Sequence, residues 1–143
     1  MTTETTGGYE YFETTADTGV RAWGSTRAEA FAQAALAVFG LLITLPDVTP
    51  HETREARAQG ADPEATLVSW INECLYVHEI EGFVACRVEM TVVTDHLAHG
   101  LLHGEELDTA RHRTGIVVKA ATAHEVSVRL DDGRHEVRFI VDV

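Results

Sequence analysis

The chain has 143 residues, of which 45% are hydrophobic and 7% aromatic; this fits one folded domain and excludes a disordered chain. With 23 acidic residues against 11 basic ones, its net charge of -12 argues against a broad nucleic-acid-binding face and favours basic proteins or cations as partners. No apolar run reaches the ~18 residues that a membrane span needs, and the polar first residues do not resemble a secretory signal.

The first residues predict a loose tail over 1–8, followed by a single domain over 9–143. A strand is expected at Tyr9–Glu13, an irregular turn at Thr14–Gly19, and a second strand at Val20–Trp23. Strand alternation puts Val20 and Ala22 on one face, and Arg21 and Trp23 on the other. Asp17 is in phase with the latter pair.

A first helix is expected after Thr26, which forms a capping box with Glu29. Its apolar residues follow one helical stripe, which predicts a face turned to a core. The stripe consists of Phe31, Ala34, Ala35, Val38, Phe39 and Leu42.

A solvent-facing strand could occupy residues 51–59, and Asp62-Pro63 is a good start for a second helix that ends at Gly82. The apolar stripe of this helix includes Cys74 and His78. Two cysteines, Cys74 and Cys86, provide neither a disulfide framework nor a CxxC motif, so buried thiols are the expected reading.

The remaining chain has the alternation of β-strands, at residues 88–93, 97–106, 116–118, 126–130 and 137–141. Asp132-Gly133 indicates a hairpin turn. Asp142 should point away from the core face that Val141 shares. The expected fold is α/β (α+β): a mostly antiparallel sheet with two amphipathic helices packed on it.

Asp17 and Asp142 are the first candidates for chemistry. A hard cation such as Ca²⁺ prefers carboxylate, carbonyl and water oxygens, and the last residue, Val143, adds main-chain oxygens beside Asp142. From the residues alone, a simpler interpretation than a shared cation site is that Asp17 is a turn residue and Asp142 an exposed charge.

The histidines between His96 and His112 are a second candidate, since three histidines can hold a catalytic zinc. That would make the chain a stand-alone metal-dependent hydrolase. Gly100 and Gly104 argue against a helix that would align His96, His99 and His103, and no HExxH motif is present, so solvated histidines are favoured.

The basic run Arg111-His112-Arg113, followed by Lys119, Thr122 and His124, could bind a phosphate. A solvated loop is the favoured alternative, because no phosphate-cradling glycine motif accompanies these residues. Cys74 and His78 at helical spacing are more readily explained as core residues than as a catalytic dyad.

Taken in order, several segments resemble the archease family. The opening is similar to an aromatic strand followed by "HTAD", the middle to a helix of the "LLVDWLNELLY" type, and the later part to a "GE…D…H…VKAVTYH" run. These segments are residues 9–20, 67–76 and 104–124, and the end Ile140-Val141-Asp142-Val143 resembles the hydrophobic-Asp-hydrophobic terminus of the family.

The resemblance implies a small α/β fold with an inserted strand–helix–strand–strand module. It implies a cytoplasmic, non-catalytic cofactor of the RNA-splicing ligase that joins ends bearing a 3′-phosphate, promoting guanylylation of the ligase and its multiple turnover in tRNA splicing. A metal site, expected for Ca²⁺ with Mg²⁺ or Mn²⁺ possible, maps onto Asp17, Asp142 and Val143.

On this reading the chain is a monomer that meets the ligase as a protein partner, touches RNA only indirectly and binds no membrane. Lys119, Thr122 and His124 are the expected partner interface. Two residues depart from the family pattern: Thr14 replaces the usual histidine, and Ala123 an aromatic residue. A family relative that has lost its ligase and stabilises another protein is an open alternative.

Overall fold

The computed structural model describes residues 7–15 and 17–143. Helix α1 (Arg27–Leu42) begins as expected: the Thr26 hydroxyl accepts a hydrogen bond from the Glu29 N–H at 3.0 Å. The Glu29 carboxylate reaches back to the Ser25 N–H at 3.4 Å, one residue before the cap. These bonds satisfy donors that have no partner within the helix.

Helix α2 (Pro63–Glu81) also has the predicted ends. Asp62 accepts a hydrogen bond from the Ala65 N–H at 2.7 Å, and Gly82 ends the helix with φ of 61°. This left-handed conformation is easily adopted by glycine, which has no Cβ. A short 3₁₀ helix, η1 (Leu45–Asp47), lies between the two helices in sequence.

The seven described strands form two antiparallel sheets rather than one. The first has the order β1-β2-β7-β6 and the second β3-β5-β4. Their bounds are β1 Gly8–Glu13, β2 Thr18–Gly24, β7 Arg134–Asp142 and β6 Ala120–Asp131, then β3 Glu52–Gln59, β5 Leu97–Glu106 and β4 Phe83–Val93. The predicted fold class is confirmed, and the tail expected at residues 1–8 lies mostly outside the described residues, since Gly8 already belongs to β1.

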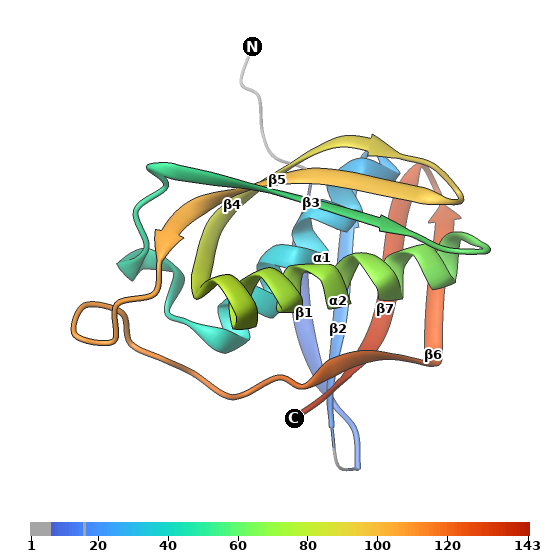
Figure 1. Cartoon of the computed structure of the whole chain (residues 1–143). Coiled ribbons are helices and arrows are strands. Elements are labelled where there is room, and N and C mark those ends of the chain that lie inside the picture. The colour runs from blue at the N-terminus through green and yellow to red at the C-terminus, as the bar shows by residue number, and fades with distance from the viewer. Residues whose placement is uncertain (1–6, 16) are drawn as a thin grey trace.

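The helices lie between the two sheets, so the molecule has three layers (Figure 1). Helix α1 packs on β2 and β4, and α2 packs on β6 and β3. At the centre, the buried Trp70 indole donates a hydrogen bond to the Phe31 carbonyl oxygen at 3.1 Å, which joins the helices directly. Because α1 is covered on both sides, Ala30, Ala32 and Ala37, which lie outside the predicted stripe, are buried too.

The second sheet belongs to one continuous stretch of chain. Strand β3, helix α2 and strands β4 and β5 follow one another over residues 52–106. This is the strand–helix–strand–strand module that the family resemblance implies. In the described part of the chain, neither helix is long and apolar enough to cross a membrane.

The prediction of a strand at residues 116–118 was wrong. This stretch is extended but belongs to neither sheet, and β6 starts only at Ala120. The Gly115 and Ile116 N–H groups instead donate to the carbonyl oxygens of Leu42 and Leu41 at 2.8 Å each. The open carbonyls at the end of α1 therefore hold this segment, as a strand partner would.

Candidate functional site

Strand register brings Asp17 and Asp142 to the same end of the four-stranded sheet. Thr18 pairs with Val141 in the antiparallel β2–β7 ladder, so one further step places Asp17 opposite Asp142. Both residues are half-buried. Val141 is fully buried, so alternation turns Asp142 to the outer face of the sheet, away from the helices.

The main chain on both sides of this pair is fixed by hydrogen bonds. The Thr14 hydroxyl donates to the Asp17 carbonyl oxygen at 3.0 Å and accepts from the Asp17 N–H at 3.1 Å. The Asp142 carbonyl oxygen accepts from the Lys119 N–H at 2.8 Å. Thr14, one of the two departures from the family pattern, therefore holds the loop that carries Asp17.

The charges at this end of the sheet are not balanced locally. Among the described residues, no salt bridge reaches the carboxylate of Asp17 or Asp142. Like charges directly opposite each other destabilise a sheet unless a cation lies between them. Two carboxylates and nearby main-chain oxygens have the chemistry that a hard divalent cation prefers.

The two aspartates alone do not complete a coordination shell. Within the described residues, no group of three or more His, Cys, Asp or Glu side chains is arranged to hold a metal ion. A cation here would take its other ligands from main-chain oxygens such as those of Val143, from water or from a partner.

The expected partner residues lie next to this end of the sheet. Thr122 pairs with Ile140 across β6 and β7, so it is on the outer face that Asp142 shares. His124 is exposed, and its N–H donates to the Thr122 hydroxyl at 3.3 Å. Lys119 directly precedes β6 and is exposed.

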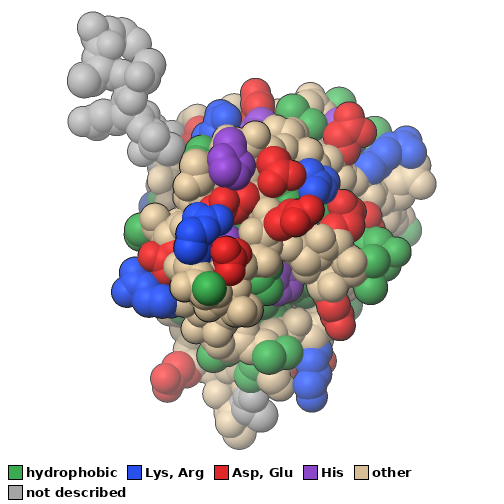
Figure 2. All heavy atoms as spheres, turned by 60° about the vertical axis from the view of Figure 1, so that its left-hand side comes forward, with side chains coloured by type: hydrophobic (Ala, Val, Ile, Leu, Met, Phe, Trp, Pro, Cys, Tyr) green, Lys and Arg blue, Asp and Glu red, His purple; other side chains and the backbone are tan. Residues whose placement is uncertain are grey.

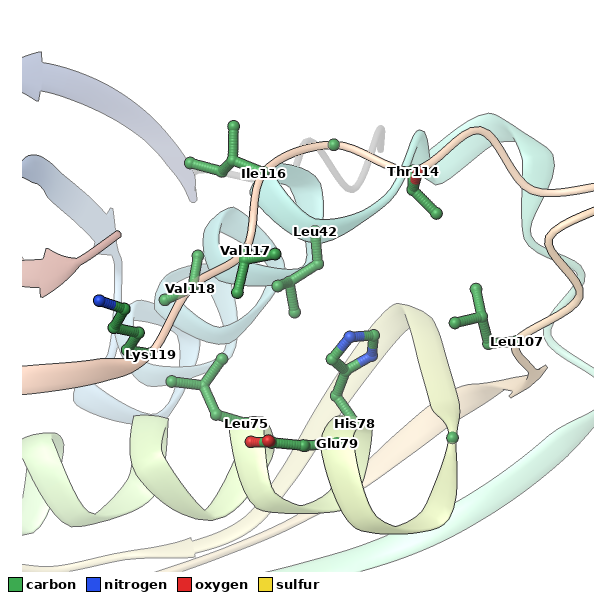
Figure 3. A pocket seen from close by; sticks show the side chains of 12 residues that line it. Leu42, Leu75, His78, Glu79, Leu107, Thr114, Ile116, Val117, Val118 and Lys119 are labelled. Carbon is green, nitrogen blue, oxygen red and sulfur yellow. The ribbon is translucent and has the colours of Figure 1, made fainter.

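An apolar groove of about 620 Å³ opens beside Lys119, between the ends of both helices and the segment that leads into β6. Figure 3 shows the His78 ring pointing into this groove from α2, with Leu42, Leu75 and Leu107 around it. The amino group of Lys119 is turned away from His78. The groove is therefore an apolar surface rather than an anion site.

The basic run at residues 111–113 does not form a phosphate site, because acidic residues already occupy it. Arg111 donates to the Glu105 carboxylate at 2.7 Å, and the His112 ring bonds the other oxygen at 2.9 Å. Arg113 makes a bidentate pair with Asp47, with both bonds at 2.9 Å. Figure 2 shows the result on this side of the molecule, where acidic and basic side chains are interleaved.

Glu105 is the centre of this network, and sequence reasoning missed it. Its side chain is only 3% exposed and also accepts the Thr49 N–H at 2.8 Å. The hydrogen bonds from Arg111 and Thr49 lower the pKa of Glu105 to about 2. A buried carboxylate needs such donors, but the sequence shows only an unremarkable Glu-Glu pair at the end of a strand.

The orientation of His112 follows from its two neighbours. Its Nδ1 accepts the Asp108 N–H at 2.8 Å, so the proton of a neutral ring is on Nε2, which donates to Glu105. The residue is 2% exposed. This histidine therefore fixes the loop rather than offering a free ligand.

The other histidines considered for zinc have separate partners. The His96 ring bonds the Gly60 carbonyl oxygen at 3.1 Å, and His99 bonds Thr91. His103 lies between Thr53 at 2.9 Å and Glu89 at 3.1 Å. The described residues therefore do not provide the three-histidine centre that a hydrolase of this kind needs.

Cys74 and His78 do not form a dyad. Cys74 is fully buried, and burial raises the pKa of its thiol. His78 donates from Nδ1 to the Phe83 carbonyl oxygen at 3.0 Å. A thiol held neutral in this way is a poor nucleophile.

Comparison with known proteins gives a consistent result. The model of the Archease protein family matches residues 9–143. Protein archease of Thermococcus gammatolerans is 37% identical over 139 residues, covering 94% of this chain and 98% of that protein. Protein archease of Sulfurisphaera tokodaii is 35% identical over 136 residues, with the same coverage.

Solved structures agree. The solution structure of Methanobacterium thermoautotrophicum protein 1598 matches with a TM-score of 0.78 and 30% identity, over 95% of this chain and 99% of that one. The crystal structure of an archease from Thermotoga maritima, described as a possible chaperone, matches with a TM-score of 0.61 at 15% identity, over 94% and 96% of the two chains. At that identity the second match concerns the fold alone.

Proposed function

The chain belongs to the archease family, and on that basis we propose that it is a non-catalytic protein cofactor of the RNA-splicing ligase that joins ends bearing a 3′-phosphate. It promotes guanylylation of the ligase and so permits multiple turnover in tRNA splicing. The observation that carries the proposal is the β2–β7 register, in which Thr18 pairs with Val141; continued by one residue, it would set Asp17 against Asp142.

In this proposal the two aspartates and the main-chain oxygens of Val143 hold a divalent cation, expected to be Ca²⁺ with Mg²⁺ or Mn²⁺ possible. The cation offsets the repulsion between facing carboxylates. Its incomplete protein shell leaves positions for ligands from the partner, so the ion can be presented to the ligase during guanylylation.

The ligase contacts the surface around this end of the sheet. Lys119, Thr122 and His124 lie on or next to β6, and Thr122 shares the outer face with Asp142. Because the protein carries a net charge of -12, we infer that the contact is with the ligase and that RNA is met only indirectly, through the ligase.

Substitution of the aspartates tests the proposal. Asp17→Asn and Asp142→Asn should each abolish stimulation of the cognate ligase in a ligation assay at limiting ligase, and weaken Ca²⁺ binding in a calorimetric titration. Removal of one carboxylate eliminates half of the charged ligands, and a site with few charged ligands has a Kd of roughly 10⁻⁴–10⁻³ M even when intact.

Asp131→Asn is the matched control, because Asp131 is an exposed aspartate at the opposite end of the same sheet. It should leave stimulation and Ca²⁺ binding unchanged. Full multiple-turnover ligation with the Asp142→Asn variant would refute the assignment. Failure of the ligase to co-purify with this protein from its source would instead favour a relative that stabilises another protein.

A further inference from the structure

The outer face of the four-stranded sheet carries a second feature, unrelated to the aspartates. Arg21 on β2 lies directly opposite Arg138 on β7. Ser127 on β6 is the next residue in the same row, on the other side of Arg138. Two like charges facing each other across a ladder are destabilising, and a neighbouring anion would offset their repulsion.

Only one of these two arginines has an acidic partner among the described residues. Arg21 pairs with Glu10 at 2.9 Å and more distantly with Glu136 at 3.7 Å. Arg138 stacks on the Phe12 ring at 4.3 Å, but no salt bridge reaches it, and its Nε atom is buried without a hydrogen-bond partner. A buried donor without a partner is costly.

These side chains surround a hollow of about 360 Å³. Its lining combines three arginines with a hydroxyl and two carboxylates: Arg21, Arg129 and Arg138, with Ser127, and Glu125 and Glu136. No salt bridge within the described residues reaches Arg129 either. The charges of the lining add to a positive value in a protein whose net charge is -12.

The backbone shapes this hollow. The β6–β7 register shifts between Thr122 and Ser127, and Glu125, within the shift, has φ of 55°. Such a bulge bends the strand and re-aims its side chains, and it is often found beside binding sites. Here it places Glu125 and Val126 in the wall of the hollow.

Unpaired arginines alone would not mark a site, since Arg57 and Arg87 on the other sheet also have no salt bridge among the described residues. Arg57 faces His99 and Arg87 faces His103, so neither is opposed by another arginine. The distinguishing features of the hollow are the opposed pair, the buried Nε and the bulge.

We propose that this hollow, lined by Arg21, Arg129 and Arg138, binds a phosphate group. Guanidinium groups match phosphate oxygens with paired N–H donors, and the Ser127 hydroxyl can add another. A phosphate in the hollow, over the outer face of the sheet, would offset the repulsion between Arg21 and Arg138 and offer acceptors to the Arg138 guanidinium. The assignment depends on the sheet alone and is independent of any ligase.

The test is an NMR titration of the full-length chain with inorganic phosphate at low salt, which measures direct binding. Arg138→Gln and the exposed Arg129→Gln should each weaken binding by about tenfold or more, the usual effect of losing a charged hydrogen-bond donor. Glu136→Gln, which removes a repelling carboxylate, should tighten it. Arg57→Gln, the matched control on the other sheet, should change it by less than about twofold.

A short single-stranded RNA ending in a 3′-phosphate distinguishes the sources of the phosphate. RNA that binds about tenfold more tightly than free phosphate, and loses this advantage in Arg138→Gln, identifies an RNA phosphate. RNA that binds no better than inorganic phosphate identifies a free phosphate or small phosphoester. Absence of phosphate binding, or binding that none of the arginine substitutions weakens, overturns the proposal.

Discussion

The carboxylate of Glu105 receives hydrogen bonds from two segments that are distant in sequence, one at Thr49 and one at Arg111 and His112. His51 adds a contact at 3.2 Å. These bonds fasten the loop after β5 to the segment before β3. A single buried side chain therefore holds a stretch that has no regular secondary structure of its own.

Glu105→Gln should destabilise the protein by roughly 2–3 kcal/mol at neutral pH, because the buried side chain loses its charge and with it the charge-assisted hydrogen bonds from Arg111 and Thr49. The folded-state pKa of about 2 lies below the ordinary value of 4.5. The contribution of this carboxylate is therefore complete above about pH 4.5 and is lost as the pH falls toward 2. Urea denaturation at several pH values should show wild type and variant converging over that range.

Glu106→Gln supplies the comparison, since Glu106 is the exposed neighbour of Glu105. Its stability should match that of wild type at every pH. A stability difference for Glu105→Gln that stayed constant down to pH 2 would mean that the ionised carboxylate is not what stabilises the loop.

At the scale of single elements, two glycines are needed for different reasons. Gly82 ends α2 with φ of 61°, and a Cβ there would meet open space. Gly104 in β5 has no positive φ, but it lies at a register shift of the β4–β5 ladder, and a Cβ there would lie 1.8 Å from the Val84 carbonyl oxygen on β4. Gly82 allows a left-handed backbone conformation, and Gly104 allows two strands to approach closely.

Gly104→Ala should therefore cost more stability than Gly82→Ala. The Gly82 change adds only the strain of a left-handed alanine, about 1 kcal/mol. The Gly104 change forces β4 and β5 apart and should cost about 3 kcal/mol. Thermal unfolding of both variants measures the difference, and equal losses would show that the strands can separate easily.

The helices were largely predictable because their signals are local. Thr26, Asp62 and Gly82 stand at their ends, and those ends were confirmed. The environment of residues 116–118 was not predictable in this way. The apolar pattern of this segment cannot reveal that its hydrogen bonds go to carbonyl oxygens at the end of α1 and not to a neighbouring strand.

The sites depend on register between distant strands, which the sequence does not display. Alternation correctly put Arg21 and Val20 on different faces of the sheet, and likewise Asp142 and Val141. It could not show that Arg21 faces Arg138, or that Glu105 would be buried among donors. The shared site of Asp17 and Asp142 was expected from family resemblance, not from periodicity, and it stays a prediction.

At the scale of the whole molecule, the three layers should unfold as one unit, because both helices are shared between the two sheets. The chain has two tryptophans, Trp23 on the four-stranded sheet and the buried Trp70 between the helices. Trp70 joins α2 to α1 through its bond to Phe31.

Trp70→Phe should reduce stability by about 2–3 kcal/mol, through the lost hydrogen bond and the smaller ring. It leaves Trp23 as the only tryptophan, so fluorescence then reports the four-stranded sheet while circular dichroism follows all layers. Coincident urea midpoints are expected from one cooperative unit. Separate midpoints would show that the module of residues 52–106 unfolds independently.

The order of strands in the first sheet also sets the order of events during synthesis. β7 lies between β2 and β6, yet it is the last of the described strands to leave the ribosome. The module of residues 52–106 is continuous and can form earlier, since contacts between segments close in sequence form most readily. The end of β2 next to Asp17 gains its partner Val141 only when β7 inserts. A translation product that stops before this strand therefore lacks Asp142 and the strand that joins β2 to β6.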